Sequence, residues 1–263
     1  MKKQRPFVRR PQDWCQKIVD RYFPGTLKSI SDEIKRSGRK CDKTVIHIAA
    51  RSGSSRLKDK NIKPLCGIPL MGYTIAIARS MGADRILVNT DSAEYAKTAE
   101  RYGAEIPFLR PPELATDKVS PGIATYYAQK WLLQQEYPVK TWIELYPTSP
   151  FRNAIKMQKY LKKAKKSGSF FTVAVPQTSF DNIYDENMCQ RSSNAEPNEN
   201  HNIFFKRIGN MTGHDLVLSN LHWRHCQIIN DPVELIDIDT ESDFEKATKI
   251  IDSGCYNFGV PIC

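Results

Sequence analysis

Residues 44–61 read TVIHIAARSGSSRLKDKN and join an apolar run of strand length to a loop of small and basic residues. A helical pattern, PLMGYTIAIARSMG, follows at residues 69–82 and ends on a glycine, as helices commonly do. A strand, a loop and a helix in this order make up the first half of a β-α-β unit, which places successive strands parallel in one sheet. We therefore expect an α/β fold.

The same alternation continues along the chain. Further strands are predicted at RILVNT (85–90), AEIPFL (104–109), TWIELY (141–146), SFFTVAV (169–175) and VELIDID (233–239). Helices are predicted at SAEYAKTAERYG (92–103), GIATYYAQKWLLQQE (122–136) and NAIKMQKYLKKAKKSG (153–168), and Thr240 begins a capping box, T-E-S-D, before a last helix. This alternation predicts a Rossmann-like, mostly parallel sheet.

Two stretches differ from this domain in composition. Residues 1–40 form a basic extension with short helices that are broken at Pro24–Gly25 and capped at Ser29 or Ser31. The main domain then occupies residues 41–263. Within it, residues 176–226 include a very polar stretch that we expect to form an exposed loop or a hairpin insertion.

The net charge of +10 is concentrated at one end of the chain. Residues 1–40 carry 12 Lys and Arg against 4 Asp and Glu, a local +8, which leaves only +2 for the rest. No apolar run approaches the roughly 20 residues that cross a bilayer, and the first residues, MKKQRPFVRR, are not followed by the apolar segment of a secretory signal. We expect a cytoplasmic protein with no membrane contact. A nucleic-acid-binding protein, using the basic extension and the KKAKK cluster (162–166), is the alternative from another class.

The seven cysteines are scattered and form no CxxC pair. We therefore expect reduced thiols rather than disulfides or a cysteine zinc site. The tightest possible zinc cluster is His222, His225 and Cys226, whose aromatic and basic surroundings are more typical of strand or surface residues.

The loop at residues 50–61 has the composition of a phosphate-binding loop. Its small residues, from Ser52 to Ser55, allow backbone amides to close on an anion, and its cations are Arg51, Arg56, Lys58 and Lys60. Neither a GxGxxG nor a GxxxxGK[ST] pattern is present. The loop therefore favours a polyphosphate ligand, with a charged surface turn as the alternative.

Asp237 and Asp239 are two residues apart in the last predicted strand. In a strand they would project from the same face, and two carboxylates beside a triphosphate predict a Mg²⁺ site. The alternatives are that Asp239 caps the following helix or that both side chains are solvated.

Five blocks, in order, resemble the CMP-sialic acid synthetase (acylneuraminate cytidylyltransferase) family. They are RSGSSRLKDKN with the following PLCGIPLMGYTI, VNTDS, FLRPPELATD, LYPTSPFR and IDIDTESDF. The resemblance implies a fold of the nucleotide-diphospho-sugar transferase type, in which residues 176–226 are an inserted segment that pairs two subunits. A free loop is the alternative for that segment.

The resemblance also implies roles for single residues. Positions that match the family's nucleotide-binding residues are Arg51, Ser54, Lys60 and Asn61 in the loop and Arg110 in the nucleotide pocket. Arg56 is similar to a loop arginine of the 3-deoxy-manno-octulosonate cytidylyltransferases, and Ser55 stands where sialic acid synthetases more often carry the basic residue. Lys60 and Arg51 would act in catalysis, and the IDIDT match assigns Asp237 and Asp239 to Mg²⁺.

The acceptor side departs from the family pattern. Tyr146 stands where the family usually has the glutamine of LQPTSP, and the region around Arg207 matches only loosely. Tyr146 and Arg207 are the candidate acceptor-binding residues, the latter as a bidentate partner for a carboxylate or else as a solvated loop cation. The resemblance implies CMP transfer from CTP to a sialic-acid-like nonulosonic acid, with pyrophosphate released. A 3-deoxy-octulosonate, a phosphonate or another nucleotide donor are the alternatives among enzymes.

Overall fold

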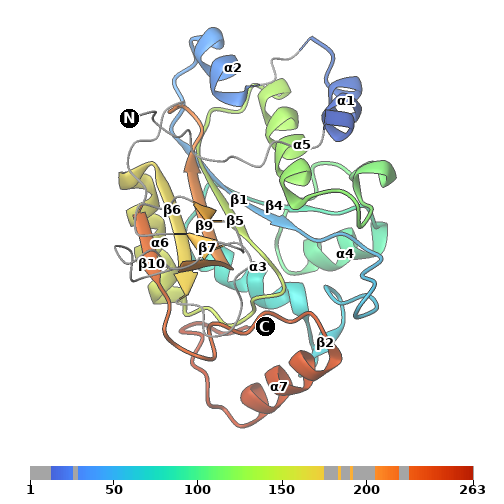
Figure 1. Ribbon diagram of the computed structural model, residues 1–263, viewed down its shortest axis with the longest axis vertical. Helices are drawn as coiled ribbons and strands as arrows, with labels where there is room; N and C mark the ends of the chain where they lie inside the picture. Colours follow the sequence, from blue (N-terminus) through green and yellow to red (C-terminus); the bar gives the residue numbers. More distant parts are fainter. Residues whose placement is uncertain are drawn as a thin grey trace.

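The computed structural model describes residues 13–25, 29–174, 183–184, 190–191, 205–218 and 225–262. Its centre is a twisted sheet with helices on both faces (Figure 1). The main strands lie in the order β10-β6-β9-β5-β1-β4. β1 is parallel to β4 and to β5, and β10 is parallel to β6, while β9 runs antiparallel to both β5 and β6. The expected mostly parallel α/β sheet is thus confirmed.

The strands include four that the apolar runs predict and others that they do not. They are β1 (Lys43–Ala49), β4 (Arg85–Asn89), β5 (Val139–Leu145), β6 (Ser169–Ala174), β9 (Phe205–Asp215) and β10 (His225–Ile228), with the short pairs β2 (Pro64–Leu65) and β3 (Ile68–Pro69), and β7 (Ile183–Tyr184) and β8 (Gln190–Arg191). All five central residues of β1 are buried, because helices cover both faces of this strand.

The helices match the predicted amphipathic segments. They are α1 (Asp13–Tyr22), α2 (Ile30–Ser37), α3 (Leu70–Ser80), α4 (Ala93–Arg101), α5 (Pro121–Gln134), α6 (Ala154–Ser167) and α7 (Glu241–Asp252). Ser29 caps α2, Thr240 forms the predicted capping box of α7, and Gly82 adopts the left-handed conformation just after α3. None of the helices in the described ranges is long and apolar enough to cross a membrane.

The two faces of the sheet have separate cores. Side chains of α3, α4 and α6 pack with Ile46 and Ile48 of β1 on one face. On the other face, α5 and Ile34 of α2 pack with Val45 and Trp142. The side chains of β1 alternate between these cores, which leaves His47 on the α5 face, within 5.0 Å of the Trp142 ring.

The extension, in residues 13–25 and 29–37, packs on α5 (Figure 1). An apolar group that we call the α1 cluster joins α1, α5 and the segment before α5; its members are Cys15, Val19, Phe23, Leu114, Ile123, Tyr126 and Tyr127. Lys130 of α5 is fully buried, and its amino group pairs with Glu33 of α2 at 2.9 Å. The predicted break at Pro24–Gly25 falls just beyond the end of α1.

Two predicted strands are wrong or incomplete. VELIDID is a turn followed by an irregular segment, because the carboxylate of Asp231 accepts from the Val233 amide and the buried Glu234 bonds to Lys156. AEIPFL makes only isolated bridges, from Glu105 to Leu87 of β4 and from Leu109 to Thr90 just after β4.

The predicted insertion at residues 176–226 contributes to the sheet itself. β9 fills the position between β5 and β6, and the beginning of β10 adds a strand at the edge beyond β6. Residues 176–182, 185–189, 192–204 and 219–224 of this segment, with His222 of the possible zinc cluster, lie outside the described residues. The ring of His225 stacks on Phe170 at 5.5 Å. A role in pairing subunits stays a prediction.

Candidate active site

The loop after β1 opens into a pocket at the carboxyl end of the parallel strands, where open α/β sheets bind ligands. The pocket has a volume of about 240 Å³. Seven of the ten predicted site residues line it: Arg51, Ser54, Arg56, Lys60, Asn61, Tyr146 and Asp239. Ser55 and Asp117 complete much of the polar wall. The structure therefore brings most of the predicted site residues together in one pocket, and their roles stay predictions.

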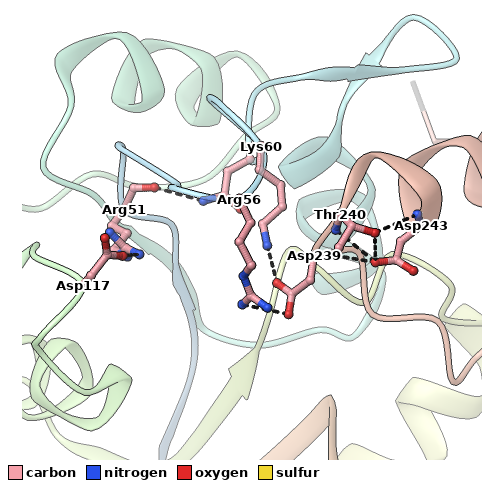
Figure 2. Close-up of polar contacts among 8 residues, drawn as sticks. Arg51, Arg56, Lys60, Asp117, Asp239, Thr240 and Asp243 are labelled. Carbon is pink, nitrogen blue, oxygen red and sulfur yellow. Dashed lines mark hydrogen bonds and ion pairs between the residues drawn. The ribbon is translucent and has the colours of Figure 1, made fainter.

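Lys60, Arg56 and Asp239 form the charged centre of the pocket (Figure 2). The Lys60 amino group lies 2.7 Å from one carboxylate oxygen of Asp239, and the Arg56 guanidinium lies 3.0 Å from the other. The side chain of Lys60 is only 9% exposed, whereas that of Arg56 is 66% exposed. Lys60 is thus a fixed cation inside the pocket, and Arg56 is a movable one at its mouth.

Arg51 forms a second charged group on the other side of the pocket (Figure 2). Its guanidinium pairs with Asp117 and reaches the carbonyl oxygens of Gly53 and Ala115 at 3.4 and 3.5 Å. The side-chain amide of Asn61 donates to the backbone oxygen of Arg51 at 3.1 Å, which ties the beginning of the loop to its end. The cations therefore line two walls of one concave space.

Three predicted site residues lie outside the lining of this pocket. Arg110 is 5% exposed and donates to the side chain and the backbone oxygen of Asn89, at 2.8 and 2.6 Å. Burial lowers the pKa of Arg110 to about 10, so the guanidinium is still charged at neutral pH. Asp237 is exposed, and Arg207 lies with its guanidinium 4.2 Å above the Phe171 ring and donates to Thr212.

A divalent cation fits the Asp239 side of the pocket. Mg²⁺ in phosphoryl-transfer sites is held by one or two carboxylates together with substrate phosphates. The Asp239 carboxylate supplies such a ligand inside the pocket, where Lys60 and Arg56 contact its two oxygens. Asp237 is not on the same strand face as predicted, because residues 236–239 are not in a strand. The described residues contain no cluster of three or more His, Cys, Asp or Glu side chains placed to hold a metal, so substrate oxygens would complete the coordination.

Tyr146 lines the pocket with its phenol beside the Glu144 carboxylate. Its phenol bonds to Glu144, and burial together with this carboxylate raises the pKa of Tyr146, so the phenol is protonated at neutral pH. The Glu144 carboxylate also accepts from Thr125 and, at 3.4 Å, from Trp142.

Arg152 is a buried residue that the sequence did not single out. It is 1% exposed and donates to the backbone oxygens of Asn210, Tyr146 and Gly209 at 2.6, 2.8 and 2.9 Å, and to Thr74 at 3.0 Å. Arg152 thus links β9 to the pocket wall. Its position in LYPTSPFR, two residues after a proline, gave no sign of these distant partners.

Comparisons with known proteins agree with this geometry. A family model described as cytidylyltransferase matches residues 45–257. An N-acylneuraminate cytidylyltransferase of Escherichia coli is 33% identical over 226 residues, which cover 79% of this chain and 52% of that protein. A CMP-N,N'-diacetyllegionaminic acid synthase of Legionella pneumophila is 30% identical over 221 residues, which cover 78% of this chain and 94% of that protein. The chain therefore spans about half the length of the first relative and nearly all of the second.

Solved structures show the same fold. A CMP:2-keto-3-deoxy-manno-octonic acid synthetase in complex with CTP has a TM-score of 0.61 and covers 81% of this chain and 100% of its own, at 14% identity. A 4-diphosphocytidyl-2C-methyl-D-erythritol synthase of Anaerococcus prevotii has a TM-score of 0.54 and covers 80% of this chain and 99% of its own, also at 14% identity. At this identity the likeness concerns the fold alone.

Proposed function

The chain belongs to the cytidylyltransferase family, and on this premise we propose that it transfers CMP from CTP to an acidic sugar of the nonulosonic acid class and releases pyrophosphate. The observation that carries the proposal is the convergence of Arg51, Arg56, Lys60 and Asp239 on one pocket at the carboxyl end of β1. The three cations can pair with the phosphates of a nucleotide, and the carboxylate can bind the metal that accompanies them. The nonulosonic acid class is supported by the sialic, legionaminic and pseudaminic acid enzymes among the relatives.

The reaction is an attack by an acceptor hydroxyl oxygen on the α-phosphorus of CTP. The new bond is the phosphoester between that oxygen and phosphorus, the bond that breaks joins the α-phosphorus to the pyrophosphate oxygen, and the hydroxyl proton passes to solvent. Lys60 is fixed deep in the pocket and stabilises negative charge that develops on the phosphoryl oxygens. Arg51 and Arg56 bind the leaving β and γ phosphates from opposite walls.

Mg²⁺ is proposed as the cofactor, with Asp239 as its principal protein ligand and Asp237 as a second one. When bound, the ion neutralises phosphate charge and acts as a Lewis acid. Lys60 and Arg56 hold the Asp239 carboxylate in the free protein. With the nucleotide and the ion bound, the phosphates would become partners of both cations, and the ion would become the partner of the carboxylate.

The acceptor is proposed to lie against Tyr146, opposite the loop cations. Arg207 is proposed to bind the acceptor carboxylate, after turning from its place above Phe171. Two further proposals go with the family. The protein pairs as a homodimer through residues 176–226, and it works in the cytoplasm, where CTP is made.

Release of pyrophosphate tests this function directly. CTP, UTP, ATP and GTP are each incubated with Mg²⁺ and with a sialic, legionaminic, pseudaminic or octulosonic acid or a small phosphonate. We expect release with CTP and a nonulosonic acid. Release with octulosonic acid alone would keep the reaction and replace the acceptor. A folded protein that gives no release in any combination would refute the enzymatic function, and the nucleic-acid alternative would then be tested by salt-dependent oligonucleotide binding.

A further inference from the structure

The α1 helix of the extension contacts the segment that leads to Asp117, a residue of the pocket lining. The hydroxyl of Tyr22, the last residue of α1, donates to the carboxylate of Glu113 at 2.8 Å. Glu113 lies in a short 3-10 helix, Pro112–Leu114, and the next residue along, Leu114, is 1% exposed within the α1 cluster. The 112–117 segment is therefore attached to α1 by one hydrogen bond and by a buried leucine.

Aromatic packing also joins the extension to Phe108, which lies in the stretch just before the 112–117 segment. The rings of Phe23 and Phe108 each make an edge contact with the ring of Tyr127, and both lie 4.9 Å from it. Tyr127 belongs to α5, so this one side chain of α5 links Phe23 of the extension to Phe108, which precedes the 112–117 segment. Contacts of this kind restrict side chains and the backbone to which they are attached.

The other end of the 112–117 segment holds Arg51. The backbone oxygen of Ala115 accepts from the Arg51 guanidinium at 3.5 Å, and Asp117 pairs with it. Both Arg51 and Asp117 line the pocket. A continuous series of contacts thus runs from α1, through the 112–117 segment, to a cation of the nucleotide site. The family match begins at residue 45, after the extension.

We propose that the extension is a working part of the nucleotide pocket, in which Tyr22 and Phe23 act as positioning residues for the 112–117 segment and so for Arg51. This inference rests on the proposed function, because it concerns the same pocket. The extension would then act on the active site, and this role requires no nucleic acid. Loosening α1 would let the segment move and would weaken CTP binding more than it slows the chemical step.

The test compares Phe23→Ala with Ile34→Ala in the full-length chain. Both substitutions remove a buried side chain of the extension, but Ile34 packs in the other cluster, with Val45 and Trp142. Hydrogen exchange of the amides of residues 113–117 is measured in the free protein, and KM for CTP and kcat are measured separately. We expect Phe23→Ala to speed exchange in this segment and to raise KM about tenfold, the ratio that corresponds to roughly 1.4 kcal/mol, with kcat nearly unchanged. Ile34→Ala should leave both quantities at the wild-type value.

A milder pair keeps the test decisive if Phe23→Ala does not fold. Tyr22→Phe removes only the hydroxyl that bonds to Glu113. Its control is Tyr137→Phe, because Tyr137 lies just before the amino-terminal end of β5. Unchanged exchange and KM in Tyr22→Phe and in folded Phe23→Ala would overturn the inference, and so would an equal effect of Ile34→Ala. If the wild type shows no turnover, the proposed function fails, while the exchange measurement still decides whether the extension positions the segment.

Discussion

The amino group of Lys60 lies 2.7 Å from the Asp239 carboxylate, so the proposed catalytic cation and the proposed metal ligand neutralise each other in the free protein. Arg56 completes the group at 3.0 Å on the other oxygen. The pairing offsets the desolvation of a nearly buried ammonium, because an unpaired charge at this depth carries a large cost. When a metal-bound polyphosphate binds, the phosphates would replace Asp239 as the partner of Lys60, and the metal would replace Lys60 as the partner of Asp239.

Replacing Lys60 with methionine should lower kcat by roughly a hundred- to a thousandfold, the usual cost of removing a preorganised charge from the transition state. Lys63→Met is the matched control, because Lys63 follows in the same loop but pairs with the exposed Glu241. Steady-state kinetics with saturating CTP provide the measurement. Equal activity of the two variants would show that Lys60 has no role in the chemical step.

Asp239→Asn should abolish Mg²⁺-dependent turnover without unfolding the protein, since Asp239 is one third exposed and an amide is a poor Mg²⁺ ligand. Glu241→Gln, two residues away and exposed, serves as the control. Turnover is followed as Mg²⁺ is titrated, and circular dichroism checks the fold. A variant with wild-type rate and wild-type Mg²⁺ dependence would remove Asp239 from the metal site.

His47 should make the protein less stable in mild acid. Its ring is buried, with Nε2 3.2 Å from the Asn89 side-chain amide nitrogen, and burial lowers the pKa of His47 to about 4. Between pH 6.5 and 4 the unfolded chain therefore binds a proton that the folded chain does not, and about 3 kcal/mol of stability is lost as the pH falls through this window. Below pH 4 this contribution does not change further.

Urea unfolding of the wild type and of His47→Gln at several pH values measures this loss. Glutamine keeps an oxygen that accepts from Asn89 but does not titrate. The variant should lose less stability than the wild type between pH 6.5 and 4. Parallel curves for the two proteins would mean that His47 is not the group responsible.

Arg152→Lys should destabilise the protein although it keeps the charge. Lysine lacks the planar fork that reaches Asn210, Tyr146 and Gly209 together, and each buried oxygen left without a donor costs about 1–3 kcal/mol. Because Arg152 holds the backbone of Tyr146, we also expect KM for the acceptor to rise more than KM for CTP. Arg101→Lys, on the exposed surface of α4, is the control. A loss of stability no larger than that of the control would contradict the role of Arg152.

The sequence predicted the elements whose own residues carry the pattern of their burial. Apolar runs and helical periods located β1, β4, β5 and β6 and the helices within a few residues, because burial on both faces of the sheet imposes those patterns. β9 was not predicted. Its residues, FKRIGNMTGHD, include two glycines and several polar groups, and the segment is a strand because β5 and β6 each leave an edge that it fills.

The candidate site was predictable where it is built from one continuous loop. Arg51, Ser54, Arg56, Lys60 and Asn61 all line the pocket because they belong to one short loop. Asp237 and Arg110 were assigned from single positions, and tertiary contacts decide where they point: Arg110 turns to Asn89, and Asp237 lies on an irregular segment. Arg152 and Glu144 were missed because their partners come from β9 and α5, which are distant in sequence.

The most direct test of the central claim follows the α-phosphorus of CTP. The protein is incubated with CTP labelled at this atom, with Mg²⁺ and with the nonulosonic acid that gives the fastest pyrophosphate release, and the products are separated and weighed by mass spectrometry. We predict that the label moves into a CMP ester of the acid, with one unlabelled pyrophosphate for each ester formed. Label that stays in CTP, or that appears only as free CMP whether or not the acid is present, would contradict the proposed transfer.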